Sequence, residues 1–157
     1  MNSTIIRKCG FQSIPFRSAL VATLILGTTA FVSADVKLKG SVGPRTIDDN
    51  VVIARNTTCT LNGTRIKGNI RVLAGAKLIA NGADITDNVQ AFDSFIVDLR
   101  QSSRINGDVR GEGTRSVLVR GGTHVGGSVQ IKEASAPSGV SALSVKNATV
   151  EGDLEVE

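Results

Sequence analysis

The single histidine of the chain, His124, is the first side chain to consider for acid–base or metal chemistry. No second His or Cys lies near it in the sequence. A zinc site needs three or four ligands, and nucleophilic catalysis needs a nucleophile paired with a base. An enzyme would have to combine His124 with Asp84 or Asp87, which are no more than isolated carboxylates. We therefore expect no catalytic residue, no metal site and no cofactor.

Long polar side chains recur at one position and offer a binding function instead. They are Arg71, Gln90, Arg110 and Gln130, at spacings of 19, 20 and 20 residues. Guanidinium groups bind carboxylates and phosphates in a two-pronged geometry, so a regular column of them suits an extended anionic polysaccharide. The simpler interpretation is an ordinary solvent-facing surface.

These side chains recur because the chain itself is repetitive. A motif of an apolar residue, any residue, Gly or Asp, a small polar residue and a second apolar residue occurs six times. Its fourth positions are 19, 19, 20, 20 and 25 residues apart. A constant period of this length is typical of a solenoid, in which each repeat packs on the next. The six polar residues are Asn50, Asn69, Asn88, Asp108, Ser128 and Asp153.

Within each repeat the apolar residues come in pairs separated by one residue, which is typical of strands and not of helices. Three short strands per repeat, joined by Gly, Asn and Asp, predict an all-β chain. We expect a right-handed parallel β-helix of about six rungs of 19–20 residues, where a rung is one turn of the chain. A left-handed hexapeptide helix is the alternative, since apolar residues also recur every six or seven positions. The extra residue per turn and the apolar pairs favour the right-handed form.

The repeated corner leads to two further expectations. Gly68, Gly107, Gly127 and Gly152 precede the polar position, with Asp in the same place in other repeats, and we expect left-handed backbone conformations there. The six polar residues are expected to stack and to hydrogen-bond from rung to rung, which is a structural role. The preference of turns for these residue types would also account for them.

Residues 1–34 form a separate segment. Three basic residues precede the apolar run 19–31, and small residues follow it. This pattern predicts a cleaved signal peptide. A membrane anchor is the alternative, but the run is shorter than the roughly 20 residues of a spanning helix. We expect an exported protein, periplasmic or extracellular, with a β-helix domain over 35–157 and no transmembrane segment in the mature chain.

Composition limits the partners. Beyond residue 34 the chain has 15 basic and 14 acidic residues, and aromatic residues make up 3% of the whole sequence. A nearly neutral chain with few rings for base stacking argues against nucleic acid. Cys59 occupies a position that is apolar in other repeats, so we expect a buried thiol and no intrachain disulfide.

The repeats have little room for loops between their predicted strands, and the one insertion is EASAPSGV at residues 133–140. Polysaccharide-cleaving β-helices build grooves from long loops and place paired carboxylates in them. This loop carries one carboxylate, Glu133. The sequence therefore favours a non-catalytic role.

The corners, such as Gly68-Asn69-Ile70, within rungs of 19–20 residues resemble those of bactofilin-like polymer-forming proteins and their secreted relatives. The resemblance covers about residues 44–157. It implies a short right-handed β-helix that assembles end to end. Bactofilins are typically cytoplasmic, whereas this chain carries a predicted export signal.

The two ends of the predicted solenoid have opposite charge. Residues 35–45 are expected to supply one short covering strand with Lys37 and Lys39, and the chain stops at Glu155 and Glu157 without a capping helix. An open solenoid end must be capped or stacked. We therefore expect an exported structural or scaffolding protein of the cell envelope that associates end to end.

Overall fold

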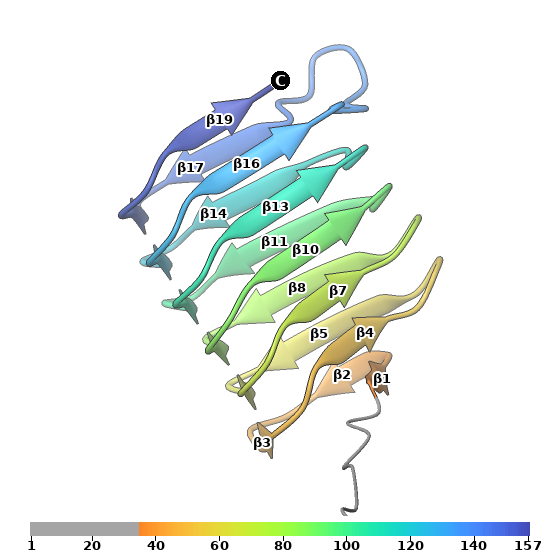
Figure 1. Ribbon diagram of the computed structural model, residues 1–157, viewed down its shortest axis with the longest axis vertical. Coiled ribbons are helices and arrows are strands. Elements are labelled where there is room, and N and C mark those ends of the chain that lie inside the picture. The colour runs from red at the N-terminus through yellow and green to blue at the C-terminus, as the bar shows by residue number, and fades with distance from the viewer. Residues whose placement is uncertain (1–34) are drawn as a thin grey trace, which may run out of the picture. The chain divides into compact units, whose positions relative to one another are not determined.

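The computed structural model describes residues 35–157, and the predicted signal peptide lies outside this part of the chain. The described residues form 19 short strands and no helix. Each strand pairs in parallel with the strand one turn later. In Figure 1 the strands nearest the viewer run to the right, those behind run to the left, and each later turn lies higher. The chain therefore winds as a right-handed parallel β-solenoid, which confirms the predicted fold class.

Three parallel sheets form the walls of the solenoid. Sheet A contains β1 (Val36–Leu38), β4 (Val51–Ile53), β7 (Ile70–Val72), β10 (Val89–Phe92), β13 (Val109–Glu112), β16 (Val129–Lys132) and β19 (Leu154–Val156). Sheet B contains β2 (Gly40–Val42), β5 (Thr58–Asn62), β8 (Lys77–Asn81), β11 (Ile96–Arg100), β14 (Val117–Arg120) and β17 (Leu143–Lys146). Sheet C contains β3 (Thr46–Ile47), β6 (Arg65–Ile66), β9 (Asp84–Ile85), β12 (Arg104–Ile105), β15 (His124–Val125) and β18 (Thr149–Val150).

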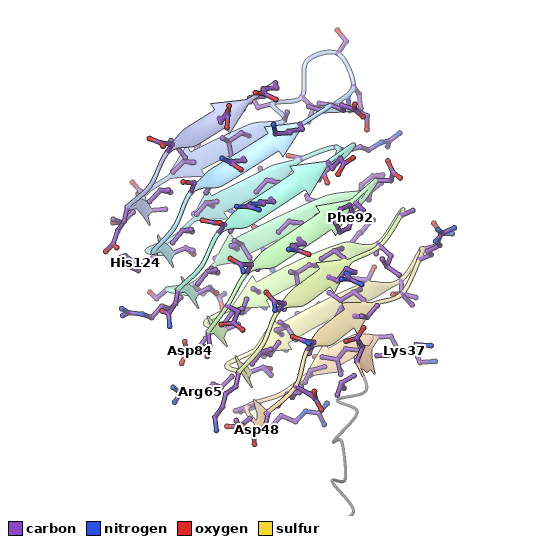
Figure 2. The ribbon with its side chains drawn as sticks, in the orientation of Figure 1. Lys37, Asp48, Arg65, Asp84, Phe92 and His124 are labelled. Atoms are coloured by element: carbon purple, nitrogen blue, oxygen red, sulfur yellow. The ribbon has the colours of Figure 1, made fainter. Side chains whose placement is uncertain are left out.

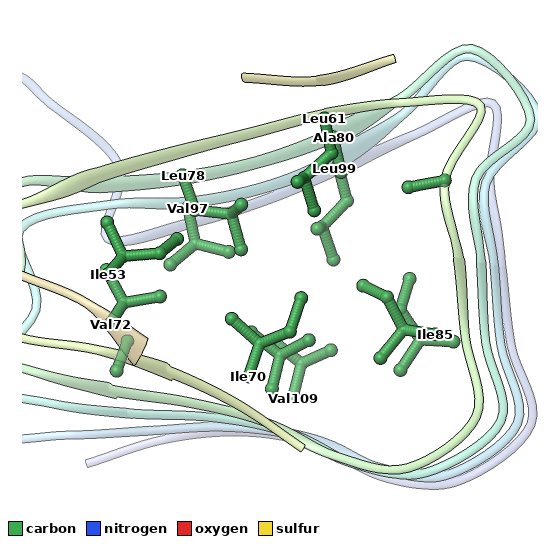
Figure 3. Close-up of a cluster of buried hydrophobic side chains, with 14 of the residues drawn as sticks. Ile53, Leu61, Ile70, Val72, Leu78, Ala80, Ile85, Val97, Leu99 and Val109 are labelled. Atoms are coloured by element: carbon green, nitrogen blue, oxygen red, sulfur yellow. The ribbon is translucent and has the colours of Figure 1, made fainter. Parts of the chain in front are cut away.

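The core is built from columns of like residues, because the register repeats from turn to turn. Val51 lies beside Ile70 in sheet A, and Cys59 lies beside Leu78 in sheet B. Side chains from all three sheets meet in the interior, as Figure 3 shows. The thiol of Cys59 is fully buried, and burial raises its pKa. Each rung thus covers the apolar side chains of its neighbours.

The predicted conformation of the corner glycines is wrong. None of Gly68, Gly107, Gly127 and Gly152 has a positive φ. Their lack of a side chain is needed for close approach instead, because a Cβ at Gly68 would lie 2.9 Å from the carbonyl oxygen of Asp49. Positive φ angles occur at the other two corners, for example 67° at Gly75 between sheets A and B.

The beginning of the solenoid also differs from expectation. Residues 35–45 were predicted to supply one short strand, but they form two, β1 and β2. β1 pairs with β4 and β2 pairs with β5 in the register of the later rungs. The first rung is therefore β1, β2 and β3; β1 and β2 precede the first copy of the motif, and β3 contains its opening residue, Ile47. Among the described residues, no helix reaches the length and apolarity needed to cross a membrane.

Candidate binding faces and end edges

The Arg/Gln column, Arg71, Gln90, Arg110 and Gln130, runs across the outer face of sheet A on adjacent strands. The two arginines are exposed and the two glutamines are half-buried. Arg110 is already engaged, since its Nη2 lies 2.9 Å from Oδ2 of Asp108. Within the described residues Arg71 takes part in no ion pair. The four side chains thus share one face, but the charge of Arg110 is paired with a carboxylate and that of Arg71 is not.

Two shallow hollows adjoin this column and both include Gln90. One, of about 360 Å³, lies between Arg71 and the corner residues Asn50, Asn69 and Asn88. The other, of about 230 Å³, lies on the opposite side of the column, next to Arg110. Its far wall is formed by side chains on β10, β13 and β16. They are Phe92, Glu112 and Lys132.

The six polar corner residues form a continuous ladder, which we call the corner ladder. Oδ1 of Asn50 accepts hydrogen bonds from the backbone N–H and the side-chain amide of Asn69, at 3.0 and 3.3 Å. The same backbone bond recurs at every later step, through Asn88, Asp108 and Ser128. These bonds satisfy donors at a tight corner, and each oxygen supports the rung that follows it. Within residues 35–157 Asp153 is the last member of the corner ladder, and its backbone N–H donates to Ser128.

A second polar ladder, which was not predicted, lies at the C-terminal ends of three adjacent strands of sheet B. The amide of Asn81 donates to Oδ1 of Asn62 at 2.8 Å, and Nε of Arg100 donates to Oδ1 of Asn81 at 2.7 Å. These residues follow the apolar pairs of sheet B at a period of 19, so the signal was present in the sequence. The column was not recognised as a repeat because its residue type changes from asparagine to arginine along the stack.

A buried carboxylate lies beside this ladder. Asp98 has a side-chain exposure of 7% and lies between Ile79 and Leu118 on the outer face of sheet B. Arg120 binds it through Nε and Nη2 at 2.9 and 2.7 Å, and Nη1 of Arg100 lies 3.6 Å from Oδ2. The hydrogen bonds that Arg120 donates to Asp98 raise the pKa of the Arg120 guanidinium. The burial of a carboxylate here is possible because it is paired and hydrogen-bonded.

The outer face of sheet B is the most basic surface of the described chain. Besides Asp98 it carries only cations among its charged residues, counting the corner residue Arg115. Phe95 holds two of them in place, with Nζ of Lys77 4.5 Å and Cζ of Arg115 4.9 Å from the ring centre. An apolar hollow of about 470 Å³ adjoins Phe95 and is bordered by the insertion at Pro137 and Val140. The five cations are Lys77, Arg100, Arg115, Arg120 and Lys146.

The candidate catalytic residues do not converge. Asp84 and His124 lie on the outer face of sheet C, two strands apart, with Arg104 between them. Figure 2 shows Asp84 and His124 at separate heights on the same edge. Asp84 pairs with Arg65 at 3.3 Å, and Nε2 of His124 lies 3.3 Å from Oε1 of Glu151. No group of three or more potential metal ligands occurs among residues 35–157.

The ends of the solenoid differ in exposure. Leu154 and Val156 on β19 hold the positions that are buried in earlier rungs, yet they are 54% and 53% exposed. In the first rung Leu38, which corresponds to Val156, is 6% exposed, and Val36, which corresponds to Leu154, is half-buried. Within the described residues the core side chains are therefore open to solvent at the last end and largely closed off at the first end, although β1 and β19 are both edge strands.

Comparison with known proteins does not identify the chain. No family model matches it, and neither the curated proteins nor the solved structures searched contain a match. The parallel β-solenoid is thus established by the strand pairing, and the resemblance to bactofilin-like proteins rests on the corner motifs alone.

Proposed function

We propose that this chain is an exported, non-catalytic structural protein of the cell envelope that associates end to end, as bactofilin-like proteins do. The observation that carries the proposal is the open last edge. Leu154 and Val156 are more than half exposed although they hold core positions of the repeat. Exposed apolar side chains next to an unpaired strand edge favour strand addition by another chain.

Charge supports the same association. Lys37 and Lys39 lie at the first end, and Glu155 and Glu157 lie at the last. The register places Lys37 at the start of the outward column that Glu155 completes. Opposite charges on the two ends favour head-to-tail contact over head-to-head contact.

The test compares the unchanged protein with the double variant Leu154→Asn/Val156→Asn. Both are expressed from the full-length sequence, so that any processing of residues 1–34 takes place in the cell. Light scattering and negative-stain microscopy over a range of concentrations should show oligomers or filaments of the unchanged protein and monomers of the variant. Val140→Asn is the matched control, because Val140 is 51% exposed but lies in the insertion. An unchanged protein that stays monomeric at high concentration contradicts the proposal.

A second candidate function is binding of an anionic envelope polysaccharide, and one specific observation favours it. Arg71, an exposed member of the Arg/Gln column, lines a hollow of about 360 Å³ together with Gln90. Sheet B offers more positive charge, so the experiment must compare the two faces. Retention on immobilised alginate, a polyuronate, should fall in Arg71→Ala/Arg110→Ala and persist in Lys77→Ala/Arg115→Ala. The reverse result assigns the binding to sheet B, and equal retention of all three proteins argues against this function.

A further inference from the structure

We propose that two copies join by strand replacement, with β19 of one copy taking the place of β1 beside β4 of the next. This inference rests on the proposed end-to-end association and specifies its geometry. It makes the partner a second copy of this chain and the acceptor site the edge of β4, at Val51–Ile53.

The number of strands in each sheet carries the argument. Among residues 35–157, sheet A has seven strands, whereas sheets B and C have six each. If β19 pairs with an intact β1, the last and first strands of sheets B and C remain one strand apart across the junction. That gap is about twice the 4.8 Å spacing of neighbouring strands, too wide for backbone hydrogen bonds. If β19 replaces β1, then β17 meets β2 and β18 meets β3, and all three sheets continue.

The two strands that would exchange are equivalent. β1 reads Val-Lys-Leu and β19 reads Leu-Glu-Val, so each places one Val and one Leu inward. Within the described residues 35–157 each pairs on one side only, β1 with β4 and β19 with β16. The free energy gained by burying apolar side chains is roughly proportional to the area buried. Exchanging one strand for the other therefore leaves the apolar area buried beside β4, and its stabilisation, nearly unchanged.

The closed first end explains why a rearrangement is needed. Leu38, Val42 and Ile47 are 6%, 6% and 9% exposed, so this end presents little apolar surface for rigid stacking. A segment there has to move before another copy can dock. A three-residue strand held by one neighbour is the part of a sheet that opens most readily. β1 meets this description, and its departure uncovers Val51 and Ile53.

The open last end gains contacts that simple stacking does not provide. Leu154 and Val156 would become buried against Val51 and Ile53 of the next copy. The partly buried residues on β17 and β18 would be covered as well. The corner ladder would also continue, since Asn50 of the next copy would follow Asp153 and donate its backbone N–H to that carboxylate. The covered residues of β17 and β18 are Leu143, Val145 and Val150.

Disulfide trapping between two variants, each with one added surface cysteine, tests the register. Chains carrying Glu155→Cys are mixed either with Val52→Cys chains or with Lys37→Cys chains and then oxidised. All three positions face outward, so the substitutions leave the core intact. The unchanged protein, which contains Cys9 and Cys59, sets the background of cross-linking.

Strand replacement predicts a 155–52 product, because Glu155 would then lie beside Val52. A dominant 155–37 product overturns the replacement but keeps the end-to-end association. Absence of both products overturns both. The cross-link therefore separates failure of this inference from failure of the proposed function.

Weakening β1 gives a second, independent result. Leu38→Asn should move association to lower protein concentration if β1 must leave, because its departure becomes easier. The same substitution should move association to higher concentration if β1 is the docking edge. Leu38→Ile is the matched control and should leave the concentration dependence unchanged. Urea unfolding of the variant verifies that the rest of the solenoid remains folded.

Discussion

The middle rungs and the last rung use the same residue pattern and differ in what covers it. Val129 and Ile131 on β16 are fully buried, whereas Leu154 and Val156, their neighbours on β19, are more than half exposed. The difference does not come from residue type, since both strands alternate apolar and polar residues. It comes from coverage, because within residues 35–157 β16 is followed by another strand of sheet A, whereas β19 is the last strand of that sheet.

This difference shows that burial in a solenoid is a property of the stack. A repeat gains stability from its two neighbours, so a terminal repeat has about half of the contacts of a middle one. The same surface that adds little stability at the end of one chain becomes core when a further rung is added. Stability and association are therefore expected to depend on different residues of the same pattern.

The largest expected effect compares one leucine in the middle with one at the end. Leu78→Ala removes a fully buried side chain and should lower the free energy of unfolding by about 2–5 kcal/mol. Leu154→Ala should change it by about 0.5 kcal/mol or less, because Leu154 is already half exposed. Urea unfolding at a concentration where the protein is monomeric measures both. Equal losses would mean that the last rung is covered in solution.

The fold could be predicted from the sequence because each column repeats at a nearly constant period. Ile70, Leu78 and Ile85 each recur one turn later as an apolar residue, which defines three walls. The first rung was underestimated because no motif copy precedes β1, and Gly40 stands where later rungs have Cys59 or Leu78.

Details of the candidate faces were less predictable for physical reasons. Gly68 was expected to need a positive φ, but its role is to let two rungs approach closely, which depends on the stacked backbone. Asp98 reads as an ordinary outward residue between Val97 and Leu99. Asp98 is buried by side chains one turn away, including Arg120, which binds its carboxylate. The alternation of residues along its own strand carries no information about those contacts.

The next effect compares two members of the corner ladder. Asn88→Ala removes the oxygen that accepts the backbone N–H of Asp108 at 2.8 Å, and should destabilise the chain by about 1–3 kcal/mol. Asp153→Ala, at the open end, should change stability by about 0.5 kcal/mol or less. Asn88→Asp keeps an acceptor oxygen and should restore most of the loss. Thermal or urea unfolding that ranks Asp153→Ala with Asn88→Ala would contradict a ladder in which each side-chain oxygen supports the following rung.

A smaller effect is expected for the ion pair on the outer face of sheet C. Arg65 and Asp84 lie 3.3 Å apart with side-chain exposures of 58% and 39%. Exposed pairs of this kind contribute about 1 kcal/mol or less, since solvent and salt screen them. A double-mutant cycle with Arg65→Ala and Asp84→Ala should give a coupling within that limit, and salt should reduce it. A coupling of several kcal/mol would mean that this face is shielded from solvent.

The smallest effect lies at the open end itself and concerns protonation. Nζ of Lys132 lies 3.0 Å from Oε2 of Glu157, and this hydrogen bond lowers the pKa of Glu157 below its ordinary value. Because the folded pKa is the lower one, the pair supports the folded end above the unfolded pKa. That support is lost as the pH falls through the folded value.

Carboxyl NMR titration of the monomeric protein measures this directly. The pKa of Glu157 should lie below 4.5 and return toward that value in Lys132→Met, which removes both the donor and the positive charge. An unshifted pKa in the unchanged protein would mean that the end of β19 is detached from β16. In that case the last strand is already free to leave its own chain, and the middle and last rungs would differ in pairing as well as in burial.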